Sequence, residues 1–123
     1  MAKKKILIVD DEQEYIATLR DFLRELDYSV DATMYPNHAL EIIAKEKPDI
    51  VLFDYKLPDM DGDSFLKRAK EMNASSSYIL ITAYRDDRII EKFKQLGAVD
   101  VVFKPVILEE LLEKIKIFTK GTA

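Results

Sequence analysis

The chain has 123 residues, a length typical of one domain, and it has no cysteine, which excludes disulfide bonds and thiolate metal sites. Its 19 basic and 23 acidic residues give a net charge of −4, a balance that argues against binding to nucleic acid. No apolar run approaches the roughly 20 residues of a membrane span, and residues 6–9 are too few for the core of a signal peptide, so we expect one cytoplasmic domain over residues 1–123 that contacts no membrane.

Short apolar segments predict the strands of a buried parallel sheet. Residues 50–53 form an apolar run between Pro48 and Pro58, which is too short for a buried helix and typical of a strand covered on both faces. The other expected strands are residues 6–9, 29–33, 78–81 and 99–103.

Segments with apolar residues at helical spacing alternate with these strands. We expect helices over residues of about 16–26, 36–44, 62–72, 86–96 and 108–118, with Leu26, Leu112 and Phe118 on their buried faces. Gly97 is expected to end the fourth helix in a left-handed conformation. The alternation predicts an α/β fold, a flavodoxin-like doubly wound (βα)5 sandwich whose parallel sheet has the strand order 2-1-3-4-5.

Charged or hydroxyl residues follow four of the expected strands: Asp10 and Asp11, Asp54, Thr82, and Lys104. Because the carboxyl ends of parallel strands meet at one edge, we expect these side chains to lie together. Three carboxylates in one cleft would raise one another's pKa, and a hard divalent cation, Mg²⁺ or Mn²⁺, would explain the cluster. Asp54 could then be a nucleophile that forms an acyl phosphate. Each residue alone also fits a turn, a strand end or a solvated surface.

These motifs resemble the receiver domains of two-component response regulators over essentially the whole chain. The segments that carry the resemblance are residues 8–12, Asp54 with residues 57–62, residues 81–84, residues 97–98 and residues 104–105. The resemblance implies a signalling phosphoacceptor rather than an enzyme, in which Asp54 receives a phosphoryl group from a histidine kinase or a histidine phosphotransfer protein. Such a domain catalyses its own phosphorylation and, slowly, its own dephosphorylation.

The resemblance also assigns roles to the residues around Asp54. It implies that Mg²⁺ binds to Asp10, partly through water, and to Asp11, Asp54 and the backbone carbonyl of Lys56. It implies that Thr82 hydrogen-bonds the phosphoryl group and that Lys104, before a usually cis proline bond, pairs with a phosphoryl oxygen. We expect an effector or a second copy of the chain to bind at the last two helices. This region contains more apolar residues than a buried helix face needs, namely Ile90, Ile107 and Ile117.

Two features are specific to this chain. Val101 stands three residues before Lys104, where many receivers have an aromatic switch residue, so we expect activation to depend on movement of the loop 82–85 and of the helix that follows it. Lys56 and Tyr84 resemble the corresponding pair in the single-domain receiver of a sporulation phosphorelay. Both side chains are long, and we expect them to exclude the water that would hydrolyse an aspartyl phosphate.

Two other classes of protein use some of the same groups. A phosphatase of the haloacid-dehalogenase type would need an acid two residues after its nucleophile, where this chain has Lys56, and an acidic pair late in the chain. A flavin or nucleotide carrier would need glycine and free N–H groups after the first strand, where residues 10–12 are acidic. We expect His38, Tyr15 and Phe118 to be surface or packing residues without a role at the site.

Overall fold

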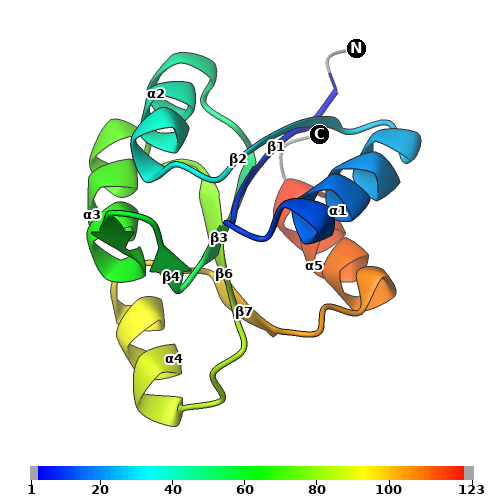
Figure 1. Ribbon diagram of the computed structural model, residues 1–123. Coiled ribbons are helices and arrows are strands. Elements are labelled where there is room, and N and C mark those ends of the chain that lie inside the picture. Colours follow the sequence, from blue (N-terminus) through cyan, green and yellow to red (C-terminus); the bar gives the residue numbers. More distant parts are fainter. Residues whose placement is uncertain (1–2, 121–123) are drawn as a thin grey trace.

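A five-stranded sheet forms the centre of the computed structural model, which describes residues 3–120 (Figure 1). Its strands are β1 (Lys5–Val9), β2 (Ser29–Thr33), β3 (Ile50–Asp54), β6 (Ser77–Thr82) and β7 (Asp100–Phe103). They are all parallel and lie in the order β2-β1-β3-β6-β7. The predicted flavodoxin-like order is therefore confirmed, with β3 at the centre of the sheet between β1 and β6.

Helices cover both faces of the sheet, as expected for a doubly wound fold. On one face lie α1 (Gln13–Glu25) and α5 (Leu108–Lys120), and on the other lie α2 (Pro36–Glu46), α3 (Gly62–Met72) and α4 (Asp87–Gln95) (Figure 1). Among the described residues, no helix is long and apolar enough to cross a lipid bilayer.

Each face has its own hydrophobic core, because successive side chains of a strand point in opposite directions. On β3, Val51 and Phe53 pack under α2, α3 and α4, whereas Ile50 and Leu52 pack under α1 and α5. All four side chains are fully buried. Burial of each contributes about 1.5 to 3 kcal/mol to stability, so β3 is anchored on both faces up to Asp54, where it ends.

Some helix boundaries and faces differ from the prediction. The first helix begins at Gln13 and ends at Glu25, and Leu26, expected on its buried face, is 44% exposed. Leu26 comes after the last helical turn, so the helical period no longer directs its side chain to the core. In α5, Leu112 and Phe118 are half-buried rather than fully buried.

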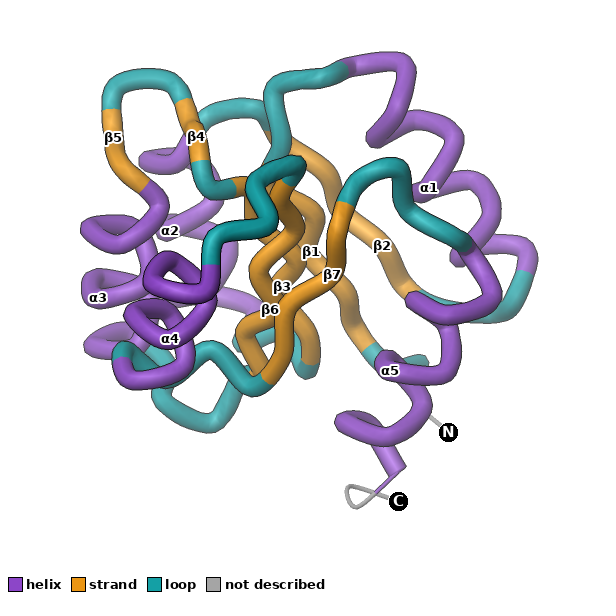
Figure 2. The backbone as a smooth tube through the Cα atoms, turned by 90° about the horizontal axis from the view of Figure 1, so that it is seen from below, coloured by secondary structure: helices purple, strands orange, loops and turns teal. Residues whose placement is uncertain are grey.

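A small hairpin that the sequence analysis did not predict lies at the edge where the parallel strands end (Figure 2). It joins β4 (Lys56–Leu57) to β5 (Met60–Asp61) as an antiparallel pair. Pro58 and Asp59 make the turn, and Asp59 has φ +62°, a conformation that aspartate tolerates better than most residues. Strands of two residues carry no periodic signal, which is why pattern analysis missed them.

Glycine is required at two positions. A Cβ atom on Gly62 would lie 2.8 Å from the carbonyl oxygen of Tyr55, so the start of α3 can approach the end of β3 only without a side chain. The amide of Gly62 uses this approach to donate a hydrogen bond to Tyr55, with an N···O distance of 3.1 Å. Gly97 follows α4 with φ +108°, which confirms the predicted stop.

Candidate functional site

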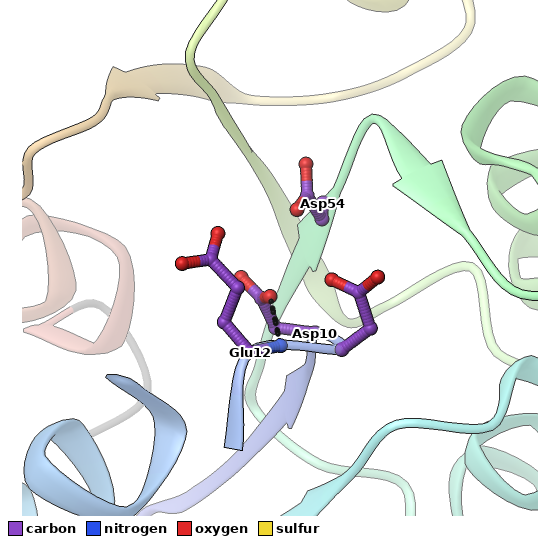
Figure 3. A group of neighbouring side chains, drawn as sticks. Asp10, Glu12 and Asp54 are labelled. Carbon is purple, nitrogen blue, oxygen red and sulfur yellow. Dashed lines mark hydrogen bonds between the residues drawn. The ribbon is translucent and has the colours of Figure 1, made fainter. Parts of the chain in front are cut away.

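The strand ends bring the predicted acidic residues together. Asp10 and Asp11 follow β1, Asp54 ends β3, and one oxygen of each, together with one of Glu12, lies within 4.8 Å of the others (Figure 3). Asp10 is buried, Asp54 is half-buried, and Asp11 and Glu12 are exposed. The cluster therefore has a buried floor and an open side toward solvent.

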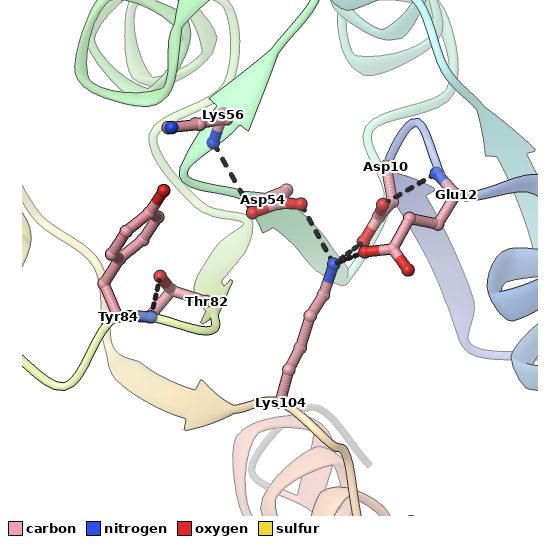
Figure 4. Close-up of polar contacts among 7 residues, drawn as sticks. All are labelled: Asp10, Glu12, Asp54, Lys56, Thr82, Tyr84 and Lys104. Atoms are coloured by element: carbon pink, nitrogen blue, oxygen red, sulfur yellow. Dashed lines mark hydrogen bonds and ion pairs between the residues drawn. The ribbon is translucent and has the colours of Figure 1, made fainter.

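Lys104 enters this cluster from the end of β7. Its ammonium nitrogen lies 3.0 Å from Asp54 Oδ2, 3.0 Å from Asp10 Oδ2 and 2.7 Å from Glu12 Oε1 (Figure 4). Burial lowers the pKa of Lys104, but its contacts with the three carboxylates outweigh this effect, so the pKa is raised and the side chain remains charged. Glu12 was given no role in the sequence analysis, although its position as a third consecutive acid was a usable signal.

Asp10 is the most deeply buried carboxylate of the group. Its pKa is raised mainly because burial disfavours the charged form, and the charge of Asp54 adds to this only as a minor cause. The expected mutual repulsion of the carboxylates is therefore present but is not the dominant effect. The backbone N–H of Glu12 donates to Asp10 Oδ1 at 3.0 Å.

The other oxygen of Asp10 has the character of a cation ligand. Asp10 Oδ2 is buried and ion-paired with Lys104, yet no donor in the described part of the chain approaches it at a hydrogen-bonding angle. Asp10 Oδ2 has lone pairs available and lies among several other carboxylates, so the possible metal ligands in this cluster are all oxygen atoms. Such a set fits a hard divalent cation such as Mg²⁺ better than a transition metal that prefers nitrogen or sulfur.

Thr82 is fully buried at the end of β6, next to the cluster. Its hydroxyl oxygen accepts a hydrogen bond from the backbone N–H of Tyr84 at 3.0 Å, so the hydroxyl is engaged within its own loop (Figure 4). The Thr82 carbonyl accepts from the backbone N–H of Lys104 at 2.9 Å. The end of β6 is thereby tied to the residue that carries the site's ammonium group.

Lys56 and Tyr84 contact each other on the outer side of Asp54. The Lys56 ammonium lies 5.1 Å from the centre of the Tyr84 ring, and a hydrogen bond with the Tyr84 hydroxyl raises the pKa of Lys56. The Tyr84 ring also meets the ring of Tyr55 edge-on at 5.5 Å. The backbone N–H of Lys56 lies 3.4 Å from Asp54 Oδ1, whereas binding of a metal by its carbonyl stays a prediction.

Tyr15 is a neighbour of the site that the sequence analysis placed among packing or surface residues. The Lys104 ammonium lies 5.1 Å from the centre of its ring, and burial raises the pKa of the Tyr15 hydroxyl. A tyrosine two residues into a helix carries no sequence signal of this contact, which only the approach of β7 to α1 creates. His38, by contrast, is exposed, and its Nδ1 lies 3.0 Å from Thr33 Oγ1.

Val101, which replaces the aromatic residue of many receivers, differs from Phe103 in its surroundings. Val101 is buried in the core beneath α4, while Phe103 is half-buried and carries the Arg85 guanidinium over its ring at 4.4 Å. The Lys104–Pro105 peptide bond is cis, as predicted. The loop after β6 thus contacts β7 through an arginine on an aromatic ring, two positions from the residue that is aromatic in many receivers.

Comparison with known proteins agrees with this geometry. The response regulator receiver domain family matches residues 6–116. Sporulation initiation phosphotransferase F of Bacillus subtilis is 36% identical over 116 residues, which cover 94% of each chain. The transcriptional regulatory protein CrdR of Helicobacter pylori is 32% identical over 117 residues, which cover 94% of this chain and 55% of that protein.

A solved structure extends the agreement to three dimensions. A CheY-like response regulator receiver domain protein from Methanospirillum hungatei JF-1 superposes with a TM-score of 0.92 at 32% identity, with 98% of this chain and 96% of that chain covered. Sequence and architecture therefore agree over almost the full length. The chain belongs to the receiver domain family of two-component response regulators.

Proposed function

We propose that Asp54 is the phosphoacceptor and that residues 1–123 act as one signalling domain. The donor is the phosphohistidine of a histidine kinase or a histidine phosphotransfer protein. The P–N bond of the donor breaks as a P–O bond to the Asp54 carboxylate forms, and the histidine nitrogen is the leaving group. Positioning and charge neutralisation account for most of the catalysis in reactions of this kind.

The observation that carries this proposal is the position of Lys104. Its ammonium nitrogen lies 3.0 Å from Asp54 Oδ2, and the Lys104 side chain is only 14% exposed. The ammonium is therefore a fixed and largely desolvated positive charge beside the proposed nucleophile. A phosphoryl group on Asp54 would bring new anionic oxygens next to this ammonium. Lys104 would then exchange a carboxylate partner for a phosphoryl oxygen without leaving its place.

The proposed cofactor is Mg²⁺, for which Mn²⁺ can substitute. Asp10, Asp11, Asp54 and the backbone carbonyl of Lys56 would hold it, and Glu12 lies close enough to contribute an oxygen. The cation would neutralise the carboxylates and the incoming phosphoryl oxygens. The exposure of Asp11 leaves this part of the cluster accessible from solvent.

Phosphorylation with acetyl phosphate and Mg²⁺ tests both assignments. Asp54→Asn should abolish the hydroxylamine-sensitive acyl phosphate, and Asp11→Ala should abolish Mg²⁺-dependent labelling with the fold intact, because Asp11 is exposed. Asp59→Asn is the matched control, since it removes a nearby carboxylate outside the cluster and asparagine tolerates positive φ. Undiminished labelling of Asp54→Asn would refute the phosphoacceptor assignment, and undiminished labelling of Asp11→Ala would refute the metal site.

We further propose that the signal passes through the loop 82–85 to the surface of α4 and α5. Thr82 would gain a contact with a phosphoryl oxygen, and Arg85 on the Phe103 ring connects the loop to β7. A ligand shifts a conformational equilibrium only through such differential contacts. Ile107 and Ile117, which are 55% and 65% exposed, offer an apolar surface for an effector or a second copy.

Amide chemical shifts measured with and without beryllofluoride and Mg²⁺ test this route. We expect the largest changes outside the cluster at residues 82–85 and along α4, with smaller changes in β2. Shifts confined to the acidic cluster would contradict a switch through this loop.

A further inference from the structure

The ammonium of Lys104 has two kinds of neighbour among the described residues. Three carboxylates approach it at 2.7 to 3.0 Å, and the ring of Tyr15 lies with its centre 5.1 Å away. A cation over an aromatic ring is attracted to the negative face of the π system, and the attraction strengthens where water is excluded. The side chain of Lys104 is only 14% exposed, so the contact with Tyr15 is largely desolvated.

The contact is made by the ring rather than by the hydroxyl. Tyr15 Oη is buried and has no hydrogen-bond partner in the described part of the chain. A buried unpaired hydroxyl destabilises a folded protein, so phenylalanine would satisfy the packing at this position as well as tyrosine does. The aromatic face is therefore the part of Tyr15 that matters to Lys104.

Unlike the carboxylates, the ring of Tyr15 is not shared between Lys104 and a metal ion. Asp10 and Asp54 are among the residues proposed to hold Mg²⁺, so their oxygens are shared between the metal and Lys104. The ring of Tyr15 is not a ligand for a hard cation and does not compete for Mg²⁺. The ring can therefore keep its contact with the ammonium when a metal or a phosphoryl group engages the carboxylates.

Tyr15 is also held in place by the fold. It lies in the first turn of α1 and packs against the core between the sheet and α5, beside the buried Ile16. Its ring therefore has a fixed position relative to the end of β7, from which Lys104 extends. A rigid face beside the long side chain of Lys104 limits the directions in which the ammonium can point.

We propose that Tyr15 is a positioning residue of the phosphorylation site, whose ring keeps the Lys104 ammonium directed at Asp54 when the carboxylates are engaged elsewhere. The inference rests on the proposed function of Asp54 and Lys104. It adds a side chain from α1 to a site otherwise built from the ends of β1, β3, β6 and β7. The result is a faster phosphoryl transfer, because Lys104 needs no reorientation when the phosphoryl group arrives.

Three variants of α1 separate the ring from packing. Tyr15→Leu removes the aromatic face, Tyr15→Phe keeps it, and Phe22→Leu is a matched control that shortens another half-buried aromatic side chain against the same core. With acetyl phosphate and saturating Mg²⁺, we expect Tyr15→Leu to label about three- to tenfold more slowly, the range of one desolvated cation–π contact. Tyr15→Phe and Phe22→Leu should stay within about twofold of the parent, because both retain the ring beside Lys104.

Two further readouts exclude a merely structural effect. In a Lys104→Met background, Tyr15→Leu should cause no additional loss, because the ring acts through the ammonium. By NMR, the Lys104 side-chain protons next to the nitrogen should be shifted upfield by the ring, with and without Mg²⁺. This ring-current shift should disappear in Tyr15→Leu and persist in Tyr15→Phe.

The proposal would be overturned by equal labelling rates in Tyr15→Leu and the parent, by an equal loss in Tyr15→Phe, or by a full additional loss in the Lys104→Met background. An upfield shift that vanishes when Mg²⁺ is added would equally contradict it. Failure of the proposed function itself would look different, because Asp54→Asn would then still be labelled.

Discussion

Asp54 lies between two lysine–tyrosine pairs that share one geometry but differ in their surroundings. Lys104 lies over Tyr15 and Lys56 over Tyr84, each with 5.1 Å between the ammonium nitrogen and the centre of the ring. The Lys104 side chain is 14% exposed and touches three carboxylates, whereas Lys56 is open to solvent. The same contact is therefore largely desolvated on one side of the site and solvated on the other.

The difference follows from the local dielectric. A cation over an aromatic ring gains about 2 kcal/mol or more where water is excluded, against about 0.5 to 1 kcal/mol at an exposed site. The inner pair is therefore suited to fixing a charge for the chemistry. We expect the outer pair to cover the site without being essential to the chemistry.

The largest expected effect distinguishes the two lysines. Lys104→Ala should slow labelling by acetyl phosphate about a hundredfold, the usual consequence of removing one charge-stabilising group from a reacting centre. Lys56→Ala should change the same rate by less than about threefold, since the Lys56 ammonium is solvated. The rates are compared at saturating Mg²⁺, and circular dichroism checks that both variants are folded. Similar rates for the two variants would remove the distinction between an inner and an outer pair.

A third pair, remote from the site, gives a test of intermediate size on stability. Lys70 lies over the ring of the fully buried Tyr78 at 5.7 Å, and the Tyr78 hydroxyl donates to the carbonyl oxygens of Ala69 and Asn73 at 3.0 and 2.7 Å. Burial raises the pKa of Tyr78 to about 12 from 10.0. The neutral phenol is thus favoured by the folded state, and its stabilising effect is complete below pH 10.

As the pH rises from 10 to about 12, the unfolded chain loses this proton while the folded one keeps it, so stability falls by about 1.4 kcal/mol per pH unit. Tyr78→Phe should be about 1 kcal/mol less stable than the parent at pH 8, where only the hydrogen bond is lost. At pH 11 and above, the stability difference between the parent and Tyr78→Phe should become smaller or change sign. Urea unfolding at the two pH values measures the stability difference. A difference that stays constant with pH would contradict the raised pKa of Tyr78. As a control, labelling of Asp54 in Tyr78→Phe should be unchanged at pH 8.

The smallest expected effect concerns the outer pair and the lifetime of the phosphoryl group. Lys56→Asn combined with Tyr84→Ala removes the covering side chains and adds an amide that can orient water. We expect spontaneous loss of phosphate to accelerate about three- to tenfold, because a water in line with the P–O bond gains access. Loss is followed after removal of the donor, and Lys92→Ala serves as a control because Lys92 pairs with Asp63 rather than with Tyr84. Equal or slower loss in the double variant would leave the covering role without support.

The order of the sheet and most of the site could be predicted because both depend on local patterns. The apolar run that becomes β3 and the acids that follow β1 and β3 are contiguous in the sequence, and parallel strands bring their carboxyl ends to one edge whatever the details of packing. Asp10, Asp54 and Lys104 were therefore expected to meet, and the structure brings them within ion-pair distance.

Tertiary structure alone decided the contacts that depend on how close two elements approach. The burial of Asp10, rather than its acidic neighbours, dominates its raised pKa, and burial is a property of the packed sheet. Glu12 and Tyr15 meet Lys104 across about ninety positions of sequence because β7 ends beside the start of α1. The β4–β5 hairpin depends on one turn at Pro58 and Asp59, and two-residue strands have no period to detect. Sequence patterns indicate which residues face a core, whereas contacts between side chains far apart in the sequence form only when the helices pack against the sheet.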